Sequence, residues 1–331
     1  MSTMIVTLKQ GADEAKVRGQ LARRGLWVGA PLRALDGTVH LPVTEGSSRV
    51  KLDELSTVDG ISTVATSESP HPLVDRHGPT IRVGAAVIGP RAPALVAGPC
   101  SVESEVQIGR IAAALAAQGV TWLRGGAFKP RTSPYAFQGA GDEALRWLRR
   151  AADAHGMKVV TEVLAEGDVP TVAEWADVLQ VGSRNMANYA LLKQIGRAAK
   201  PVLLKRAMSA TVEEWLLAGE YLLAHGAPGV VFCERGVRGF DPSTRNLLDL
   251  GAVALLAHVY GVPVIVDPSH ATGRRELVLP LARAAIAAGA AGVMIETHDA
   301  PEQAKSDGPQ ALLPDQVADL ARELRVAGGV R

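Results

Sequence analysis

The sequence predicts an α/β protein in which a closed barrel follows a small α+β domain. From residue 94 onward, eight short apolar runs alternate with helical segments rich in Ala and Leu, a pattern typical of parallel strands joined by helical crossovers. Residues 1–67 instead run strand, helix, strand, strand, helix, strand, which is the ferredoxin-like order. We therefore predict a (β/α)8 TIM barrel preceded by a ferredoxin-like domain.

The small domain is predicted from short apolar runs and turn signals. Strands are expected at 4–8, 26–35, 38–43 and 61–67, and helices at 12–24 and 48–58. Asp36 and Gly37 form a turn signal between the second and third strands. Residues 68–79 have the composition of a linker, so the barrel domain is expected at 80–331, beginning with a short hairpin.

The barrel strands are expected at 94–98, 120–124, 158–163, 178–182, 201–205, 229–233, 263–267 and 292–296. Eight such units in roughly 240 residues suit a closed barrel better than an open doubly wound sheet. An open sheet that binds a dinucleotide would carry a glycine-rich turn after its first strand, and the sequence there, AGPCSVE, is not one.

Composition excludes several classes of function. Lys and Arg total 35 and Asp and Glu total 34, so the chain lacks the basic excess typical of proteins that bind nucleic acid or anionic membranes. Two cysteines do not make a disulfide framework, and the N-terminal MSTMIVTLKQ is not a signal peptide. The most apolar stretch, 277–295, contains Arg283 and reads as a helix followed by a strand. We expect a cytoplasmic protein with no membrane or nucleic-acid partner.

Polar residues follow every predicted barrel strand, at the end where barrel enzymes carry their chemistry. A single arginine after a strand is usually part of a solvated ion pair, but polar groups at all eight ends together indicate a site. These groups are Cys100, Arg124, Glu162, Ser183 with Arg184, Lys205 with Arg206, Glu234 with Arg235, Asp267 with Ser269 and His270, and Glu296.

Cations make up the first subset of these residues. Buried cations that converge on one mouth repel one another unless anions neutralise them, and arginine forks match phosphate and carboxylate edges. The sequence therefore predicts a site for a small phosphorylated acid, with a second phosphate held by Arg131 and Thr132 in the loop GGAFKPRTSPYAFQG. The inner cations are Arg124, Lys129, Arg184, Lys205 and Arg235.

A thiol, an imidazole and two carboxyl groups make up the second subset: Cys100, His270, Glu296 and Asp307. This mixture of sulfur, nitrogen and oxygen donors suits a borderline divalent first-row metal better than calcium or magnesium. No tight spacing motif supports it. A core cysteine, a capping aspartate and a hydrogen-bonded histidine are the alternatives.

The motifs AGPCSVES, RGGAFKPRTSPYAFQG, VGSRNMANYALL, CERGVRGFDPSTRNLLDL, VDPSHATGRRELV and IETHDAPEQAKSDGPQAL carry a family resemblance. The chain resembles 3-deoxy-D-arabino-heptulosonate 7-phosphate (DAHP) synthase, type I beta branch, over residues 80 to 325; the first 67 match by pattern only. The similar 3-deoxy-D-manno-octulosonate 8-phosphate synthases typically read Lys-Ala-Asn-Arg-Ser in the loop that here reads KPRTS, 129–133.

The resemblance implies the first step of the shikimate pathway, which leads to chorismate and the aromatic amino acids: condensation of phosphoenolpyruvate (PEP) with D-erythrose 4-phosphate. It implies one divalent ion (Mn, Fe, Co, Zn or similar) on Cys100, His270, Glu296 and Asp307, and catalytic roles for Lys129, Glu162 and His270. Erythrose 4-phosphate would lie on Pro130, Arg131 and Thr132. PEP would lie on Arg124, Lys129, Gly182, Ser183, Arg184, Lys205 and Arg235.

Alternatives and partners stay open at this point. The octulosonate synthase and a non-catalytic paralogue that binds a chorismate mutase are the competing hypotheses. Ser183 and Ala207 depart from what relatives often carry, without removing an expected ligand. The family implies a homodimer or homotetramer, a possible chorismate mutase partner, and a regulatory, ACT-like role for residues 1–67 in sensing Tyr or Phe.

Overall fold

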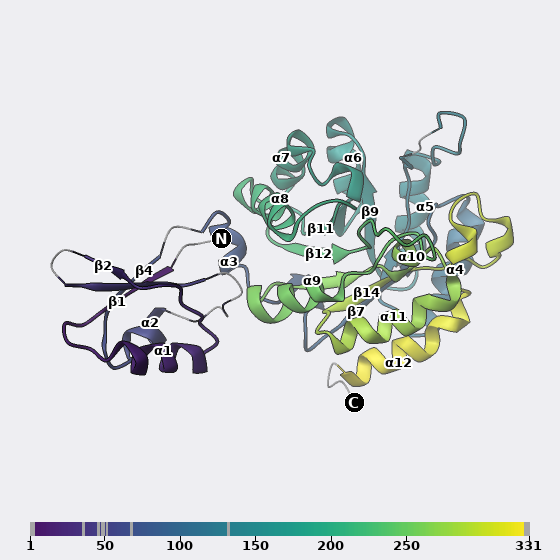
Figure 1. Ribbon diagram of the computed structural model, residues 1–331. Helices are drawn as coiled ribbons and strands as arrows, with labels where there is room; N and C mark the ends of the chain where they lie inside the picture. The colour runs from purple at the N-terminus through teal and green to yellow at the C-terminus, as the bar shows by residue number, and fades with distance from the viewer. Residues whose placement is uncertain are drawn as a thin grey trace. The chain divides into compact units, whose positions relative to one another are not determined.

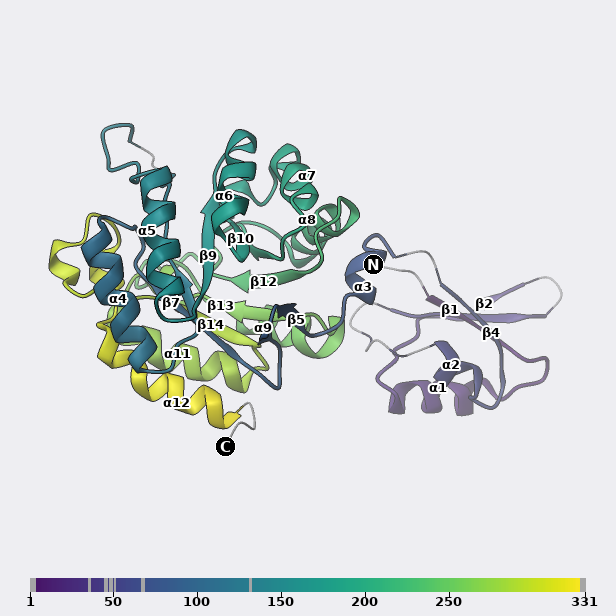
Figure 2. The same ribbon diagram turned by 180° about the vertical axis from the view of Figure 1, so that it is seen from behind.

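The computed structural model describes residues 4–34, 37–44, 47, 50, 52–66, 69–130 and 133–327. Two compact units divide the chain, Met1–Pro72 and Leu73–Arg331. Each unit is described by itself below; Figures 1 and 2 show the elements from two sides.

The first unit is a four-stranded antiparallel sheet with two helices on one face (Figure 1). The strand order β2-β3-β1-β4 is that of the predicted ferredoxin-like domain, and the sheet and helices enclose a core that includes Val6, Leu21, Leu41 and Leu55. In chain order the elements are β1 (Met4–Leu8), α1 (Glu14–Arg23), β2 (Leu32–Arg33), β3 (Val39–Pro42), α2 (Leu52–Ser56) and β4 (Ile61–Thr66).

The second strand of this unit is much shorter than predicted. Of the expected 26–35 segment, the structure describes 26–34, and only Leu32–Arg33 of these is strand; Val28 makes an isolated bridge to Val43. Pro31 has no N–H to give to a ladder, which explains why pairing does not continue through it. The helix expected at 48–58 is observed as Leu52–Ser56; residues 48, 49 and 51 lie outside the described part of the chain.

The second unit is the predicted closed barrel of eight parallel strands. The strands pair in the order β7-β8-β9-β10-β11-β12-β13-β14, and β14 pairs with β7 to close the ring. The predicted runs are all strands: three match the prediction, four are shorter by one or two residues, and one is shifted by one residue. Their bounds are Ala94–Gly98, Trp122–Arg124, Lys158–Val163, Val178–Val181, Val202–Lys205, Val230–Glu234, Val264–Val266 and Gly292–Glu296.

Helices surround the strands and bury apolar side chains against them (Figure 2). None of the described helices is long and apolar enough to cross a membrane. Caps fix several of the starts: Ser104 accepts from Gln107 N, and Thr211 and Glu214 form a capping box. The helices are α4 (Glu105–Ala117), α5 (Asp142–Asp153), α6 (Val169–Trp175), α7 (Tyr189–Arg197), α8 (Val212–Ala224), α9 (Leu250–Ala254) with a π-helical extension (Leu255–Tyr260), α10 (Pro268–Thr272), α11 (Arg275–Ala287) and α12 (Ala318–Ala327).

A hairpin closes one end of the barrel. After α3 (Pro72–Arg76), strands β5 (Ile81–Val83) and β6 (Ala86–Ile88) pair with each other. Ile81, Val83 and Ile88 are buried in one cluster with inward-facing strand residues such as Val96 and Trp122. Apolar side chains therefore fill this end, and the polar strand ends lie at the opposite mouth.

Gly98 allows β7 and β8 to approach closely just before the chain reaches Cys100. Its φ is 152°, an angle that residues with a side chain rarely adopt. A Cβ at this position would lie 1.9 Å from the backbone oxygen of Arg124. The position therefore requires glycine, and it holds the first and second strand ends together.

We expect Gly98→Ala to destabilise the barrel, by about 1–3 kcal/mol if the neighbouring backbone can move, because the added methyl group overpacks a rigid contact. Gly109→Ala is the matched control. Gly109 lies inside α4 with nothing within 4 Å of an added Cβ, so that change should stabilise the protein by about 0.4–1 kcal/mol. Thermal and urea unfolding of both variants would check this. Equal stability of the two proteins would contradict the close-approach argument.

Candidate active site

A cavity of about 490 Å³ opens at the carboxyl ends of the barrel strands. Cys100 and Glu296 do not line it; both are buried behind its wall. The barrel thus brings together nearly all of the sequence-predicted residues that the structure describes. The predicted residues in the wall are Arg124, Lys129, Pro130, Glu162, Gly182, Ser183, Arg184, Lys205, Arg235, His270 and Asp307.

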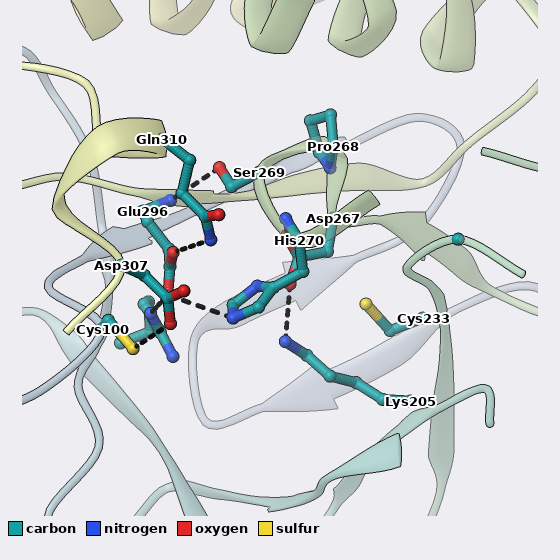
Figure 3. A network of polar contacts seen from close by, with 12 residues as sticks. Cys100, Lys205, Cys233, Asp267, Pro268, Ser269, His270, Glu296, Asp307 and Gln310 are labelled. Carbon is teal, nitrogen blue, oxygen red and sulfur yellow. Dashed lines mark hydrogen bonds and ion pairs between the residues drawn. The ribbon is translucent and has the colours of Figure 1, made fainter. Parts of the chain in front are cut away.

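Cys100, His270, Glu296 and Asp307 form one compact cluster (Figure 3). One ligand atom from each side chain can be chosen so that all four atoms lie within 4.8 Å of one another. The Cys100 thiol donates to Asp307 Oδ2 at 3.1 Å, and His270 Nε2 lies 3.2 Å from Glu296 Oε1. Sulfur, nitrogen and oxygen donors at this spacing could hold a divalent ion.

The local backbone aims these side chains. Asp267 directly follows β13 and caps the short helix α10 by accepting from His270 N, which places His270 in the first turn. Ser269 Oγ accepts from the backbone N–H of Glu296 at 3.1 Å, linking the same helix to the end of β14. Asp307 has φ 53°, the left-handed conformation that aspartate tolerates better than most residues. Asp307 therefore reaches the cluster from an irregular loop.

Charge in the cluster is arranged for a cation. Burial raises the pKa of the Cys100 thiol to about 12, and the neighbouring carboxylate of Glu296 adds to this; Lys129, with Nζ 3.0 Å from the sulfur, partly opposes it. Burial also acts to raise the pKa of Asp307, but His270 and other donors hold it well below its usual range. The pKa of Glu296 is lowered as well, by His270 and Arg124 against the effect of burial. Two ionised carboxylates thus face a protonated thiol, and a metal ion bound by the sulfur would displace the thiol proton.

Two of the five inner cations already have anionic partners within the protein. Arg124 Nη1 donates to Glu296 Oε1 at 2.9 Å, and Lys205 Nζ donates to Asp267 Oδ2 at 2.6 Å. The prediction that all five inner cations need an anionic ligand is therefore wrong for these two. The reason is that barrel closure brings each cation within reach of a carboxylate two strands away, from β14 to β8 across β7 and from β13 to β11 across β12.

Arg184 and Arg235 are different, because neither has an ion pair among the described residues. Arg235 is buried, its Nη1 has no hydrogen-bond partner in the described part of the chain, and burial lowers its pKa below the ordinary value. Lys129 Nζ donates to the carbonyl oxygen of Cys100 at 3.0 Å. A buried guanidinium with a free N–H at the cavity wall is the arrangement that an anionic ligand completes.

Glu162 lies on β9 and lines the cavity. Gln180, its register partner on β10, donates from Nε2 to Glu162 Oε2 at 3.2 Å. A Cβ on Gly182 would lie 1.9 Å from Glu162 Oε1. A side chain at residue 182 would therefore displace the Glu162 carboxylate from this position.

Several predicted and unpredicted residues complete the description. Arg131 and Thr132 lie outside the described residues. Arg206, which follows β11, and Glu234, the last residue of β12, form a buried ion pair in which Nη1 lies 3.0 Å from Oε2. Sequence reasoning assigned no role to Asp267. The signal that could have found it was a charged residue directly after the apolar run 263–266, which the structure shows to be buried. Sequence reasoning also missed Gln310, which donates to Glu296 Oε2.

A family model described as the DAHP synthetase I family matches residues 73–327. The chain belongs to this family.

The similarity to known members covers nearly the whole chain. A phospho-2-dehydro-3-deoxyheptonate aldolase of Thermotoga maritima is 43% identical, with 97% of each chain aligned. The crystal structure of the DAHP synthase from Thermotoga maritima matches with a TM-score of 0.77 and 41% identity, covering 99% of this chain and 98% of that one. A 2-dehydro-3-deoxyphosphooctonate aldolase of Acidithiobacillus ferrooxidans is 34% identical over 70% of this chain and 88% of its own.

These matches confirm the predicted family, the barrel with its small N-terminal sheet, and the enzyme class. The chain therefore shares the fold and the enzyme class of the DAHP synthases that it matches. The four-residue cluster gives it a site that could hold a metal ion.

Metal binding should become tighter as pH rises. Below the pKa of about 12 the Cys100 thiol is protonated, and the bound form requires a thiolate, so binding releases one proton. Between pH 7 and 9 we expect the affinity for Co²⁺ or Zn²⁺ to rise close to 10-fold per pH unit, about 1.4 kcal/mol.

Cys100→Ser should weaken binding and flatten this slope, as measured by calorimetric titration at several pH values. Cys233→Ser is the matched control, because Cys233 is also a buried free thiol but is not in the cluster. A slope that Cys100→Ser leaves unchanged would show that another group loses the proton.

Proposed function

We propose that this chain condenses PEP with D-erythrose 4-phosphate and water to give DAHP and inorganic phosphate. The observation that carries the proposal is a cation-lined cavity that shares a wall with a cluster of thiol, imidazole and carboxylate donors. PEP carries a phosphate and a carboxylate, and the cavity offers fixed cations on four strands. The family membership and the printed names of the relatives agree with this reaction.

Binding of PEP would use the cations that the protein leaves without carboxylate partners. Arg235 presents a buried N–H with no partner among the described residues, and Arg184 lines the same cavity. Lys205 and Arg124 add positive charge while they stay paired with Asp267 and Glu296. The backbone at Gly182 and Ser183 would complete the pocket, which has no space for a side chain at residue 182.

The bonds change in a balanced order. C3 of PEP attacks the aldehyde carbon of erythrose 4-phosphate, and the aldehyde oxygen takes up a proton. Positive charge develops at C2, and water adds there and loses a proton. The C2–O bond to phosphate then breaks, the C2 hydroxyl loses its proton to become the keto group of DAHP, and inorganic phosphate leaves. A divalent ion on Cys100, His270, Glu296 and Asp307 would supply Lewis acidity to the aldehyde oxygen; Mn, Fe, Co and Zn all suit this donor set.

Two residues would move protons. The buried ammonium of Lys129, 3.0 Å from Cys100 Sγ, lies next to the donor cluster and would give a proton to the former aldehyde oxygen. Glu162, held by Gln180, would accept the proton of the water that adds to C2. Holding both substrates in register by fixed cations removes part of the entropic barrier, up to roughly 7–11 kcal/mol for ideal alignment.

The loop that follows β8 would select which aldose phosphate reacts. Pro130 lines the cavity, and the KPRTS sequence, 129–133, resembles the heptulosonate form rather than the octulosonate form. We infer that Arg131 and Thr132 bind the phosphate of erythrose 4-phosphate. The octulosonate synthase is the second candidate, favoured only by the 34% identity to that enzyme class.

Phosphate release with PEP and each of two aldoses tests the function. We expect release with erythrose 4-phosphate, little or none with arabinose 5-phosphate, and loss of activity in a chelator that divalent metal restores. Gly182→Ala, which crowds Glu162, should lower kcat at least 10-fold. Preference for arabinose 5-phosphate would establish the octulosonate synthase instead, and no turnover with any metal would favour a non-catalytic protein.

The N-terminal unit is proposed to regulate the enzyme. A ferredoxin-like sheet with both helices on one face leaves its other face available, and feedback by Tyr or Phe is a logical signal for the first step of their synthesis. Such an effector changes activity only through different affinities for two states of the protein. A homodimer or homotetramer and a chorismate mutase partner are further proposals from the family.

A truncated protein starting near Leu73 tests the regulatory role. The expected result is that the full chain is inhibited by Tyr or Phe at millimolar concentration, while the truncated enzyme keeps its turnover and does not respond. Trp serves as the control amino acid. Equal responses of the two proteins, or no response of the full chain, would mean that this unit has a different role.

A further inference from the structure

Asp267 connects the two halves of the proposed active site. It is the first residue after β13, it is fully buried, and its two carboxylate oxygens have three partners (Figure 3). Oδ1 accepts from the backbone N–H of His270 at 3.0 Å. Oδ2 accepts from Lys205 Nζ at 2.6 Å and lies 2.7 Å from His270 Nδ1.

The shared oxygen fixes how both neighbours are oriented. Asp267 can only accept, so His270 Nδ1 carries a proton, and Nε2 is the ring nitrogen that faces the donor cluster, 3.2 Å from Glu296 Oε1. Lys205 lines the cavity on the other side of the same carboxylate. The single negative charge of Asp267 is therefore shared by His270, a candidate metal ligand, and Lys205, a candidate phosphate-binding cation.

We propose that Asp267 is a positioning residue that couples the metal site to the PEP site, so that occupancy of one strengthens the other. This inference rests on the proposed function for the identity of the anion. It goes beyond that function, because Asp267 has no place in the reaction steps and contacts neither proposed substrate.

The sign of the coupling follows from hydrogen-bond strength. A cation on Nε2 makes the Nδ1–H of His270 a stronger donor, which draws the carboxylate charge of Asp267 toward the imidazole and leaves Lys205 freer to bind an anion. In the other direction, an anion that engages Lys205 leaves more of the carboxylate charge to the imidazole, so His270 becomes a stronger ligand. Linkage requires both effects to have the same size.

A divalent ion and PEP also attract each other directly, so the test must separate this attraction from the coupling through Asp267. A double-mutant cycle does so without substrate or turnover. Lys205→Met removes the competing cation, and Asp267→Asn keeps the shape of the side chain but removes its charge. The measurement is the affinity for Co²⁺ by calorimetric and absorbance titration of the wild type, the two single variants and the double variant.

The coupling predicts that Asp267→Asn weakens Co²⁺ binding by about 10- to 100-fold, the usual cost of losing the hydrogen-bond partner of a ligating histidine. Lys205→Met should strengthen Co²⁺ binding by about 5-fold or more in the wild-type background and by less than about 2-fold in the Asp267→Asn background. Asp249→Asn is the matched control, since Asp249 caps α9 and pairs with Arg206 without touching the cluster. It should leave Co²⁺ affinity unchanged.

An equal effect of Lys205→Met in both backgrounds would overturn the proposal, because only direct electrostatics would then act. If Asp267→Asn does not fold, Arg184→Met replaces it as the comparison, since Arg184 lines the same cavity without a carboxylate partner among the described residues. A gain from Lys205→Met no larger than from Arg184→Met would also overturn it.

The change in Co²⁺ affinity on adding PEP is a second measurement of the same coupling. PEP should tighten Co²⁺ binding in the wild type and much less in Asp267→Asn. Failure of PEP to bind the wild type would count against the proposed function, while the cycle with Co²⁺ alone would still decide the role of Asp267.

Discussion

Charge compensation inside the barrel mouth is the constraint on which the rest of this active site depends. Glu296 and Asp267 are fully buried carboxylates, and each is paired with a buried cation on another strand end, Arg124 and Lys205. Removing one member of such a pair leaves an unpaired buried charge, which typically costs about 3–5 kcal/mol. The strand ends are therefore held at a fixed spacing by electrostatics as well as by the ladder of the sheet.

This compensation divides the mouth into two regions with different chemistry. On the side of β14 and β7, anionic and thiol donors outnumber cations, and the lowered pKa values of Glu296 and Asp307 keep both carboxylates charged. On the side of β10 and β12, Arg184 and Arg235 have no anionic partners among the described residues. A site that binds a cation beside an anion requires such an asymmetry, and Asp267 lies at the boundary between the two regions.

The fold supplies the rigidity that such a site needs. Apolar side chains of the β5–β6 hairpin fill one end of the barrel, which leaves the loops at the other end to carry the site. Both kinds of aldolase among the relatives match this chain, at 43% identity over 97% of its length and at 34% over 70%. Discrimination between their aldoses is then expected in the loop after β8, where the sequence KPRTS, 129–133, resembles the heptulosonate form.

By itself the sequence determined the barrel, its eight strands and eleven of the seventeen residues that line the cavity, because apolar periodicity marks strands and barrel geometry places their ends at one mouth. The predicted length of β2 was wrong, because the two strand residues that follow Pro31 leave little periodic signal. Only the tertiary structure decided which charges pair: Arg124 and Glu296 are 172 positions apart, and Lys205 and Asp267 are 62 apart. Periodicity reports which face a side chain occupies, but partners on different strands depend on barrel closure and on rotamers that no local pattern encodes.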